Sequence, residues 1–149
     1  MKTRVVAERK KARAASRKLW NGLIRYNLQQ AGPFSYKRTV LTVRDAKKRI
    51  LGGVILQSYW LETYVELLWL SARARRLGLG RQLMQEAERR ARRRGSRLLH
   101  LNTYSFQAPG FYEKLGYKPF GELRDLSNPT RRFWLWKRLA RGRTPKARR

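Results

Sequence analysis

A turn with two glycines and three arginines holds the residues best suited to bind a charged ligand. Residues 75–81 read Arg-Arg-Leu-Gly-Leu-Gly-Arg and lie between an apolar, strand-like run and an amphipathic helical pattern. Several backbone N–H groups must converge on a pyrophosphate to bind it, and side chains would block that approach, which favours glycine at 78 and 80. Arg75, Arg76 and Arg81 would add positive charge beside those donors. The segment therefore predicts a phosphate-binding turn at a helix N-terminus.

Two better-known phosphate motifs do not fit this segment. A Walker loop needs G-x-x-x-x-G-K-S/T, and that spacing does not occur. A dinucleotide-binding fold places its first glycine directly after a strand, completes G-x-G-x-x-G and has an acid about 20 residues further on. Here residues 71–77 separate the strand from the first glycine. Leu83 occupies the position of the third glycine, and Asn102 occupies the position where the acid is expected. Both motifs are excluded.

A second segment begins 28 residues after Gly80 and reads Ala-Pro-Gly-Phe-Tyr-Glu-Lys-Leu-Gly-Tyr over residues 108–117. It predicts a short helix that carries the phenol of Tyr112 near the glycine turn. Two roles are open for this phenol. It could act as an acid in the site, or it could pack as a core aromatic beside Phe111 with its hydroxyl bonded to the backbone.

Together the two segments resemble the GNAT superfamily of N-acetyltransferases. The turn matches the family pattern Q/R-x-x-G-x-G/A, and residues 103–117 match a longer segment of one bacterial branch, so the resemblance covers roughly residues 23–139. It implies an α/β fold whose mixed central sheet has six to seven strands and about three to four flanking helices. The parallel strands 63–70 and 97–103 would splay apart, with the pantetheine arm of acetyl-CoA in the gap.

The resemblance also implies a reaction and a set of contacts. An acetyl group would pass directly from acetyl-CoA to a primary amine, without a metal and without a covalent enzyme intermediate. Tyr112 would protonate the departing thiolate, and a backbone N–H near Leu68 and Trp69 would stabilise the acetyl oxygen. The implied acetyl-CoA contacts are Leu68, Trp69, Leu70, Arg75, Arg76, Leu77, Gly78, Leu79, Gly80, Arg81, Asn102, Ser105, Ala108, Phe111 and Lys114.

A primary amine needs a base, because at a pKa of about 10.4 only about one molecule in 2,500 is neutral at pH 7, a cost of about 4.6 kcal/mol. Strict alternation along the strand 63–70 puts Glu62, Tyr64, Glu66, Leu68 and Leu70 on one face, which in similar enzymes looks toward the acetyl group. Glu66 is the preferred base and Glu62 the second choice, acting directly or through water. Either could instead be an ordinary acid on the sheet, paired with an arginine.

Three residues of the strand 97–103 and the turn after it weaken or limit these expectations. Ser105 stands where many family members have an asparagine that bonds the pantetheine arm, and Asn102 replaces an acid common in the branch. Contacts from this strand to acetyl-CoA are therefore less firmly predicted than the phosphate grip. His100 is interpreted as a structural residue, because no acid-plus-nucleophile spacing surrounds it.

The composition sets the size and the class of the protein. A chain of 149 residues with 42% apolar content can bury one core, so a single domain is predicted over residues 1–139. Residues 140–149 hold five bases and no large apolar group, which predicts a disordered tail. No cysteine is present, which excludes disulfides and an acetyl-cysteine, and a single histidine leaves no His pair for a metal.

The charge is unusually positive. The chain has 37 Lys and Arg against 9 Asp and Glu, a net charge of +28, with six arginines between positions 89 and 97. Such a field attracts polyanions and disfavours polycationic acceptors, unless Glu62, Glu66 and Glu122 create a local negative well. The excess could be a solvated surface, or it could bind nucleic acid nonspecifically.

The coarse pattern supplies the elements that position these residues. We expect helices over 7–30, 78–94 and 108–115, and strands over 39–44, 49–58, 63–70, 97–103, 118–123 and 131–139. The second helix would bury Leu79, Leu83, Ala87 and Ala91. Gly52 and Gly53 suggest a bulge or a close backbone approach in the second strand.

The sequence favours a protein of the cytoplasm. Its apolar, uncharged run over residues 50–61 has 12 residues, short of the roughly 20 that span a bilayer. The basic N-terminus lacks the apolar core of a signal peptide, although a mitochondrial transit segment stays open as an alternative. No membrane partner is expected. The sequence does not distinguish a monomer from a homodimer.

The sequence thus predicts an N-acetyltransferase that uses acetyl-CoA and an unidentified small-molecule amine. A nucleic-acid or ribosome-associated protein that keeps the fold but has little or no turnover is the main alternative. A simple RNA-binding module with chance glycine turns is a third possibility.

Overall fold

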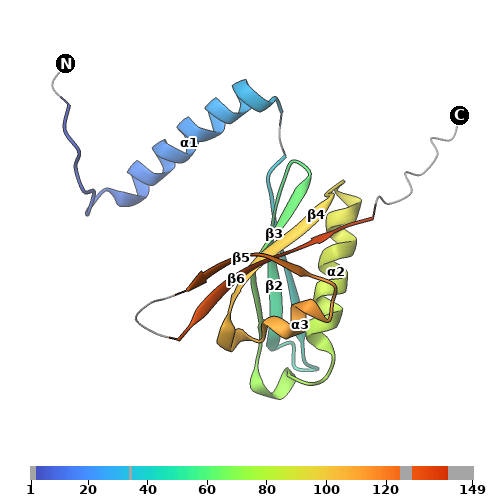
Figure 1. Cartoon of the computed structure of the whole chain (residues 1–149). Helices are drawn as coiled ribbons and strands as arrows, with labels where there is room; N and C mark the ends of the chain where they lie inside the picture. Colours follow the sequence, from blue (N-terminus) through green and yellow to red (C-terminus); the bar gives the residue numbers. More distant parts are fainter. Residues whose placement is uncertain (1–2, 34, 125–128, 141–149) are drawn as a thin grey trace, which may run out of the picture. The chain divides into compact units, whose positions relative to one another are not determined.

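A six-stranded sheet with the order β1-β2-β3-β4-β6-β5 is the main feature of the structure, a computed structural model that describes residues 3–33, 35–124 and 129–140. The strands are β1 (Lys37–Arg44), β2 (Ile50–Tyr59), β3 (Glu62–Leu70), β4 (Leu98–Tyr104), β5 (Lys118–Arg124) and β6 (Arg131–Arg138). Only β3 and β4 run parallel among these neighbouring pairs (Figure 1). The predicted mixed sheet around one parallel pair is confirmed.

The helices of the described residues are α1 (Ala12–Ala31), α2 (Leu79–Arg93) and α3 (Pro109–Glu113), with short 3-10 turns η1 (Ala72–Ala74) and η2 (Ser105–Gln107). The chain divides into two compact units, Met1–Phe34 and Ser35–Arg149. Whether residues 1–139 form one domain, as the sequence predicts, stays a prediction. The predicted disordered tail, residues 140–149, lies outside the described residues except for Ala140.

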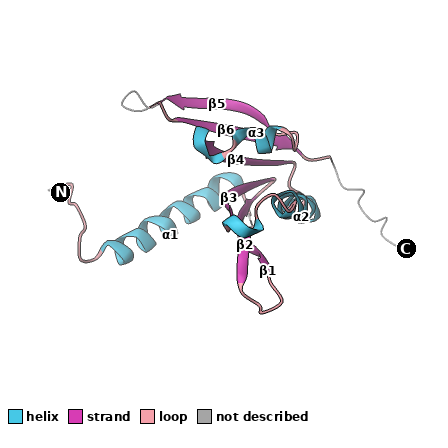
Figure 2. Ribbon diagram, turned by 90° about the horizontal axis from the view of Figure 1, so that it is seen from below, coloured by secondary structure: helices cyan, strands magenta, loops and turns pink. Residues whose placement is uncertain are grey.

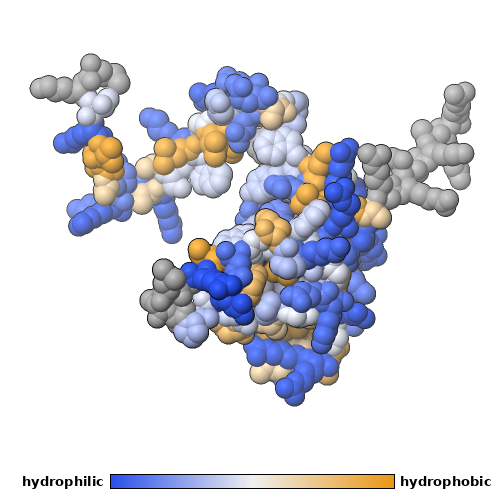
Figure 3. Space-filling view, in the orientation of Figure 1, coloured by the Kyte–Doolittle hydropathy of each residue, from blue (hydrophilic) through white to orange (hydrophobic). Residues whose placement is uncertain are grey.

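The first unit is essentially α1. This helix begins five residues later than predicted and ends before Gly32, whose φ is 72°. Its apolar side chains, among them Leu19, Trp20 and Leu23, are exposed. Figure 3 shows hydrophobic residues on the surface of this helix. Among the described helices, α1 included, none combines the length and the apolar content that crossing a membrane requires.

The core of the second unit lies between α2 and one face of the sheet (Figure 2). The helix buries Leu83, Met84, Ala87 and Ala91, while Leu79 is half-buried, so the predicted stripe is largely correct. Alternate strand residues meet them, for example Val54 and Leu56 of β2, Leu99 and Leu101 of β4, and Leu135 of β6. Each such side chain contributes roughly 1.5–3 kcal/mol when it leaves water.

Two glycines let β2 sit close to its neighbours. A Cβ on Gly52 would lie 2.4 Å from the carbonyl oxygen of Trp69, and one on Gly53 would lie 2.3 Å from that of Leu41. The close backbone approach predicted for this pair is confirmed. It brings the start of β2 close to the end of β3, where Leu70 and Trp69 lie opposite the two glycines.

The parallel pair β3–β4 is short. Its register runs only from Glu62 opposite Leu98 to Val65 opposite Leu101, after which the two strands diverge. The later part of β3 keeps its antiparallel partner β2 through Leu70. The edge of β3 that faces β4 therefore opens over residues 66–70, as the resemblance implied.

A bulge at Glu66 corrects the predicted alternation of β3. Opposite the adjacent residues Ile55 and Leu56 of β2 stand Leu67 and Val65, so Glu66 is the extra residue. Past the bulge the faces exchange: Leu68 lies opposite buried Val54 and packs on the core. Leu68 and Leu70 thus lie on the α2 face, opposite to the face of Glu62 and Tyr64, and the single-face prediction was wrong because alternation cannot reveal a bulge.

Candidate active site

Two adjoining cavities lie where β3 and β4 separate, with volumes of about 670 Å³ and about 510 Å³. We call the larger the strand cavity and the smaller the turn cavity. Both are lined by Leu68, Leu70, Arg75, Gln107, Ala108 and Tyr112. Because so much of the lining is shared, the two form one path from the glycine turn to the bulge of β3.

The turn cavity lies at the N-terminus of α2. Gly78 precedes the helix with a left-handed backbone, and no side chain caps it. The first closing bond runs from the N–H of Gln82 to the carbonyl of Gly78 at 3.1 Å, so within the described ranges the N–H groups of Leu79, Gly80 and Arg81 have no acceptor. Free donors at a helix N-terminus favour an anion. The geometry suits the phosphate predicted here.

The two glycines of this turn are needed for different reasons. Gly78 is favoured by its backbone conformation, a left-handed φ of 72°, and not by lack of space, because a Cβ there would meet nothing within 4 Å. A Cβ on Gly80 would lie 3.2 Å from Cζ of Phe111, so packing against α3 also requires glycine at this position. Arg76 and Ala108, which line the same cavity, are left-handed at φ 64° and 60° and store strain beside the site.

Tyr112 of α3 lines both cavities and is 8% exposed. Its ring packs edge-on against Phe111 and Tyr117, at centroid distances of 5.0 and 6.1 Å. Its hydroxyl has no hydrogen-bond partner in the described part of the chain. The hydroxyl oxygen is nevertheless accessible to solvent. Burial raises the pKa of Tyr112 to about 12. The phenol therefore stays protonated at neutral pH and can donate into the cavities.

Glu66 lies on the wall of the strand cavity at the bulge. Arg38 of β1 donates to both of its carboxylate oxygens, at 3.2 and 3.3 Å, and the amide of Gln57 donates at 2.8 Å. The hydrogen bond from Arg38 is the main reason that the pKa of Glu66 is lowered, with Gln57 second. Glu66 is thus a stable carboxylate, and its ion pair is exposed, so a cationic ligand can compete with Arg38.

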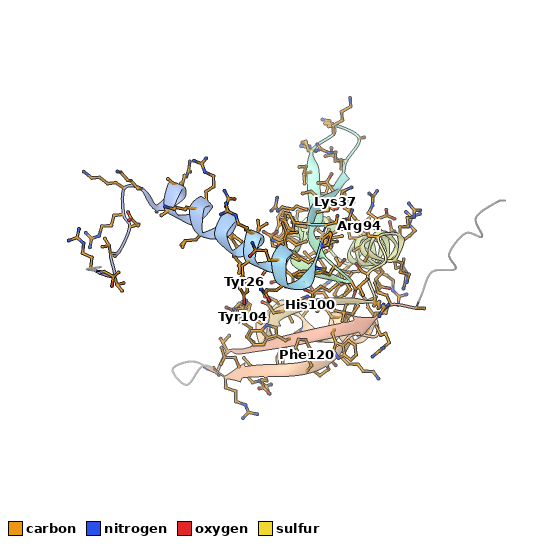
Figure 4. The ribbon with its side chains drawn as sticks, turned by 90° about the horizontal axis from the view of Figure 1, so that it is seen from above. Tyr26, Lys37, Arg94, His100, Tyr104 and Phe120 are labelled. Atoms are coloured by element: carbon orange, nitrogen blue, oxygen red, sulfur yellow. The ribbon has the colours of Figure 1, made fainter. Side chains whose placement is uncertain are left out.

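A polar network fastens β3, β4 and β6 on the face away from α2. Arg132 donates to Oδ1 of Asn102 at 2.8 and 2.6 Å, and Nδ2 of Asn102 donates to the Tyr64 hydroxyl at 2.7 Å. His100, two residues before Asn102 on β4 (Figure 4), lies 3.5 Å from Glu62, and burial lowers its pKa, so it is mostly neutral at pH 7. Asn102 lines the strand cavity with its amide already engaged.

Most of the predicted acetyl-CoA contacts lie together. The two cavities contain Glu66, Leu68, Trp69, Leu70, Arg75, Arg76, Gly78, Leu79, Gly80, Arg81, Asn102, Ala108, Phe111 and Tyr112. The structure does not bring Glu62, Leu77, Ser105 or Lys114 into either lining; Ser105 instead accepts a hydrogen bond from the backbone N–H of Arg131.

Sequence reasoning missed five lining residues, namely Leu67, Thr103, Tyr104, Phe106 and Gln107. Four of them belong to the segment 103–117 that carried the resemblance, which was the available signal. No group of His, Cys, Asp or Glu in the described ranges is arranged to hold a metal ion.

The fold is that of an acetyltransferase. The sequence profile of the acetyltransferase (GNAT) domain matches residues 37–119, and the chain belongs to that family. It is 30% identical to an acetyltransferase of Agrobacterium fabrum over 127 residues, which cover 84% of this chain and 91% of that protein. The crystal structure of an acetyltransferase from Agrobacterium tumefaciens matches with a TM-score of 0.83 at 28% identity, covering 92% of this chain and 99% of that one.

A further relative is the blasticidin-S acetyltransferase of Streptomyces morookaense, 40% identical over 77 residues. That match covers 51% of this chain and only 57% of the relative.

Proposed function

We propose that this protein transfers the acetyl group of acetyl-CoA directly to a primary amine. The observation that carries the proposal is the continuity of the two cavities. They connect the free N–H groups at the start of α2 with the carboxylate of Glu66, and Tyr112 lies on the wall of both. A donor bound by its phosphates at one end would thus place its reactive group beside an acid and a base.

The turn cavity suits the phosphates of acetyl-CoA. The N–H groups of Leu79, Gly80 and Arg81 would bind the pyrophosphate, with the charges of Arg75 and Arg76 beside them. The open edge of β3 over residues 66–70 would receive the pantetheine arm, and a backbone N–H near Leu68 would face the acetyl oxygen. When bound, acetyl-CoA supplies an acetyl group already activated as a thioester.

The strand cavity would orient the amine. The ionised Glu66 attracts an ammonium group, and it receives the proton directly or through a water molecule. Because the pKa of Glu66 is lowered, it holds a proton poorly, and the rate should rise with pH as the free amine becomes more abundant. Tyr112 would donate its phenolic proton to the leaving sulfur and regain one from water, while the proton taken from the amine passes from Glu66 to solvent.

The test is thiol release from acetyl-CoA with a panel of primary amines. Glu66→Gln should lower kcat/KM at least tenfold for any accepted amine, because the carboxylate at the bulge is lost. Glu62→Gln is the matched control, since Glu62 lines neither cavity, and it should retain most of the activity. No thiol release with any amine would refute the function, and equal loss in both variants would refute the role of Glu66.

The charge of the protein supports a secondary proposal, nonspecific attraction of nucleic acid. Around the end of α2, Arg93 and Arg97 have no acidic partner in the described residues, and the chain as a whole has a net charge of +28. Such binding should weaken steeply with salt, and a flat response in an oligonucleotide titration would contradict it. The expected small-molecule acceptor, cytoplasmic location and monomeric or dimeric state are also proposals.

A further inference from the structure

An aromatic stack borders the strand cavity at the end of β4. The rings of Tyr104 and Phe106 lie nearly parallel, with an interplanar angle of 8° and a centroid distance of 5.4 Å. The guanidinium of Arg132 lies 5.2 Å from the Tyr104 centroid and 5.2 Å from that of Trp134. Planar groups of β4, η2 and β6 are thus already arranged in layers.

Phe106 ends this stack and is 73% exposed, although it belongs to a fixed turn. The backbone N–H of Tyr104 donates to the side-chain oxygen of Gln107 at 3.0 Å, and the hydroxyl of Ser105 accepts from the N–H of Arg131 at 3.2 Å. Both ends of the turn are therefore tied down. The structure holds an apolar ring face in solvent with its orientation set by Tyr104.

The exposed ring and the candidate base share one cavity. Phe106 and Glu66 both line the strand cavity, and the half-exposed side chains of Leu67 and Trp69 line it as well. A ligand that places an ammonium at Glu66 can therefore place an apolar group on Phe106. Offset stacking at 4.5–7 Å is the arrangement that aromatic rings prefer, and it matches the spacing already present between Tyr104 and Phe106.

We propose that Phe106 is a stacking site for the acceptor, which is a primary amine joined to a planar aromatic or heteroaromatic ring. The ring extends the Tyr104–Phe106 stack while the amine reaches Glu66. That the bound amine is the acceptor rests on the proposed function. The stacking itself can be measured without turnover.

The test compares 2-phenylethylamine with 2-cyclohexylethylamine on the full chain saturated with CoA, by isothermal titration calorimetry. The two amines have the same chain and carbon number, and the cyclohexyl group is the more hydrophobic, so apolar burial alone favours it. Stacking should instead make the planar amine bind about fivefold more tightly. Phe106→Leu should abolish that preference and Phe106→Trp should retain it.

Phe120→Leu is the matched control, because Phe120 is 60% exposed on β5 and lines neither cavity (Figure 4). It should leave the preference unchanged. Equal affinities in the wild type, no binding of either amine, or a preference that survives Phe106→Leu would overturn the proposal. Thiol release, measured separately, distinguishes the two ideas: planar selectivity without any turnover refutes the proposed function, and turnover without planar selectivity refutes the stacking site.

Discussion

Replacing Tyr112 by Phe separates chemistry from folding, because Tyr112 lines both cavities but its hydroxyl has no hydrogen-bond partner among the residues that the structure describes. The proposed function has the phenol donate to the departing sulfur. A hydrogen bond to a charged group contributes about 1.5–3 kcal/mol, so losing it should lower kcat about 10- to 150-fold. The ring still packs against Phe111 and Tyr117, so the affinity for CoA should stay near that of the wild type.

The same substitution should barely change the free energy of unfolding, by no more than about 0.5 kcal/mol, because no buried group in the described residues loses a partner. Tyr117→Phe is the matched control. Its hydroxyl donates to buried Glu88 at 3.2 Å, so its loss should lower stability by about 1–3 kcal/mol and leave kcat largely intact. Initial rates of thiol release and urea unfolding measure both effects. Equal kcat for Tyr112→Phe and wild type would remove Tyr112 from the mechanism.

Three further predictions concern stability. Burial penalises the ionised form of Tyr112 and raises its pKa from 10 to about 12, so the fold should lose up to about 3 kcal/mol of stability as the pH rises from 10 to 12. Urea titrations of Tyr112→Phe should lack that part of the decline. Glu88→Gln removes the buried carboxylate that lies 2.8 Å from the ammonium of Lys137, and it should lower the free energy of unfolding by roughly 3–5 kcal/mol. Glu86→Gln is the control and should cost much less, because the arginine partners of Glu86 are exposed. Similar losses in urea unfolding of the two variants would contradict the role of burial. Ala108→Gly relieves a left-handed alanine and should raise the unfolding free energy by about 1 kcal/mol, and an unchanged or lower melting temperature would show that no strain is stored there.

The order of the elements could be predicted from the sequence because periodicity is local. Strands β2 and β4 and helix α2 follow their patterns to within a residue or two at each end. The bulge at Glu66 could not be predicted, because it depends on how Leu67 and Val65 align with the neighbouring strand. One extra residue then moved Leu68 and Leu70 to the opposite face from the one expected.

The candidate site shows the same division. The position of the glycine turn at the N-terminus of α2 was predictable because glycine spacing before a helical pattern is a local signal. Packing of Gly80 against Phe111 was not, because it joins two elements that are distant in the sequence. Phe106 was missed because a pattern of residue types does not show whether an aromatic ring is buried or exposed. The hydrogen bonds that hold Glu66 come from two other strands and were equally invisible.

The two sides of the candidate site differ in a way that bears on how this protein can evolve. In the proposed site the phosphates would be bound by main-chain N–H groups, which most substitutions outside Gly78 and Gly80 leave in place. The wall on the other side consists of exposed side chains such as Leu67, Trp69 and Phe106, which carry little of the core. Selection can therefore exchange one acceptor for another through a few surface changes, while the machinery that handles the acetyl donor is inherited intact.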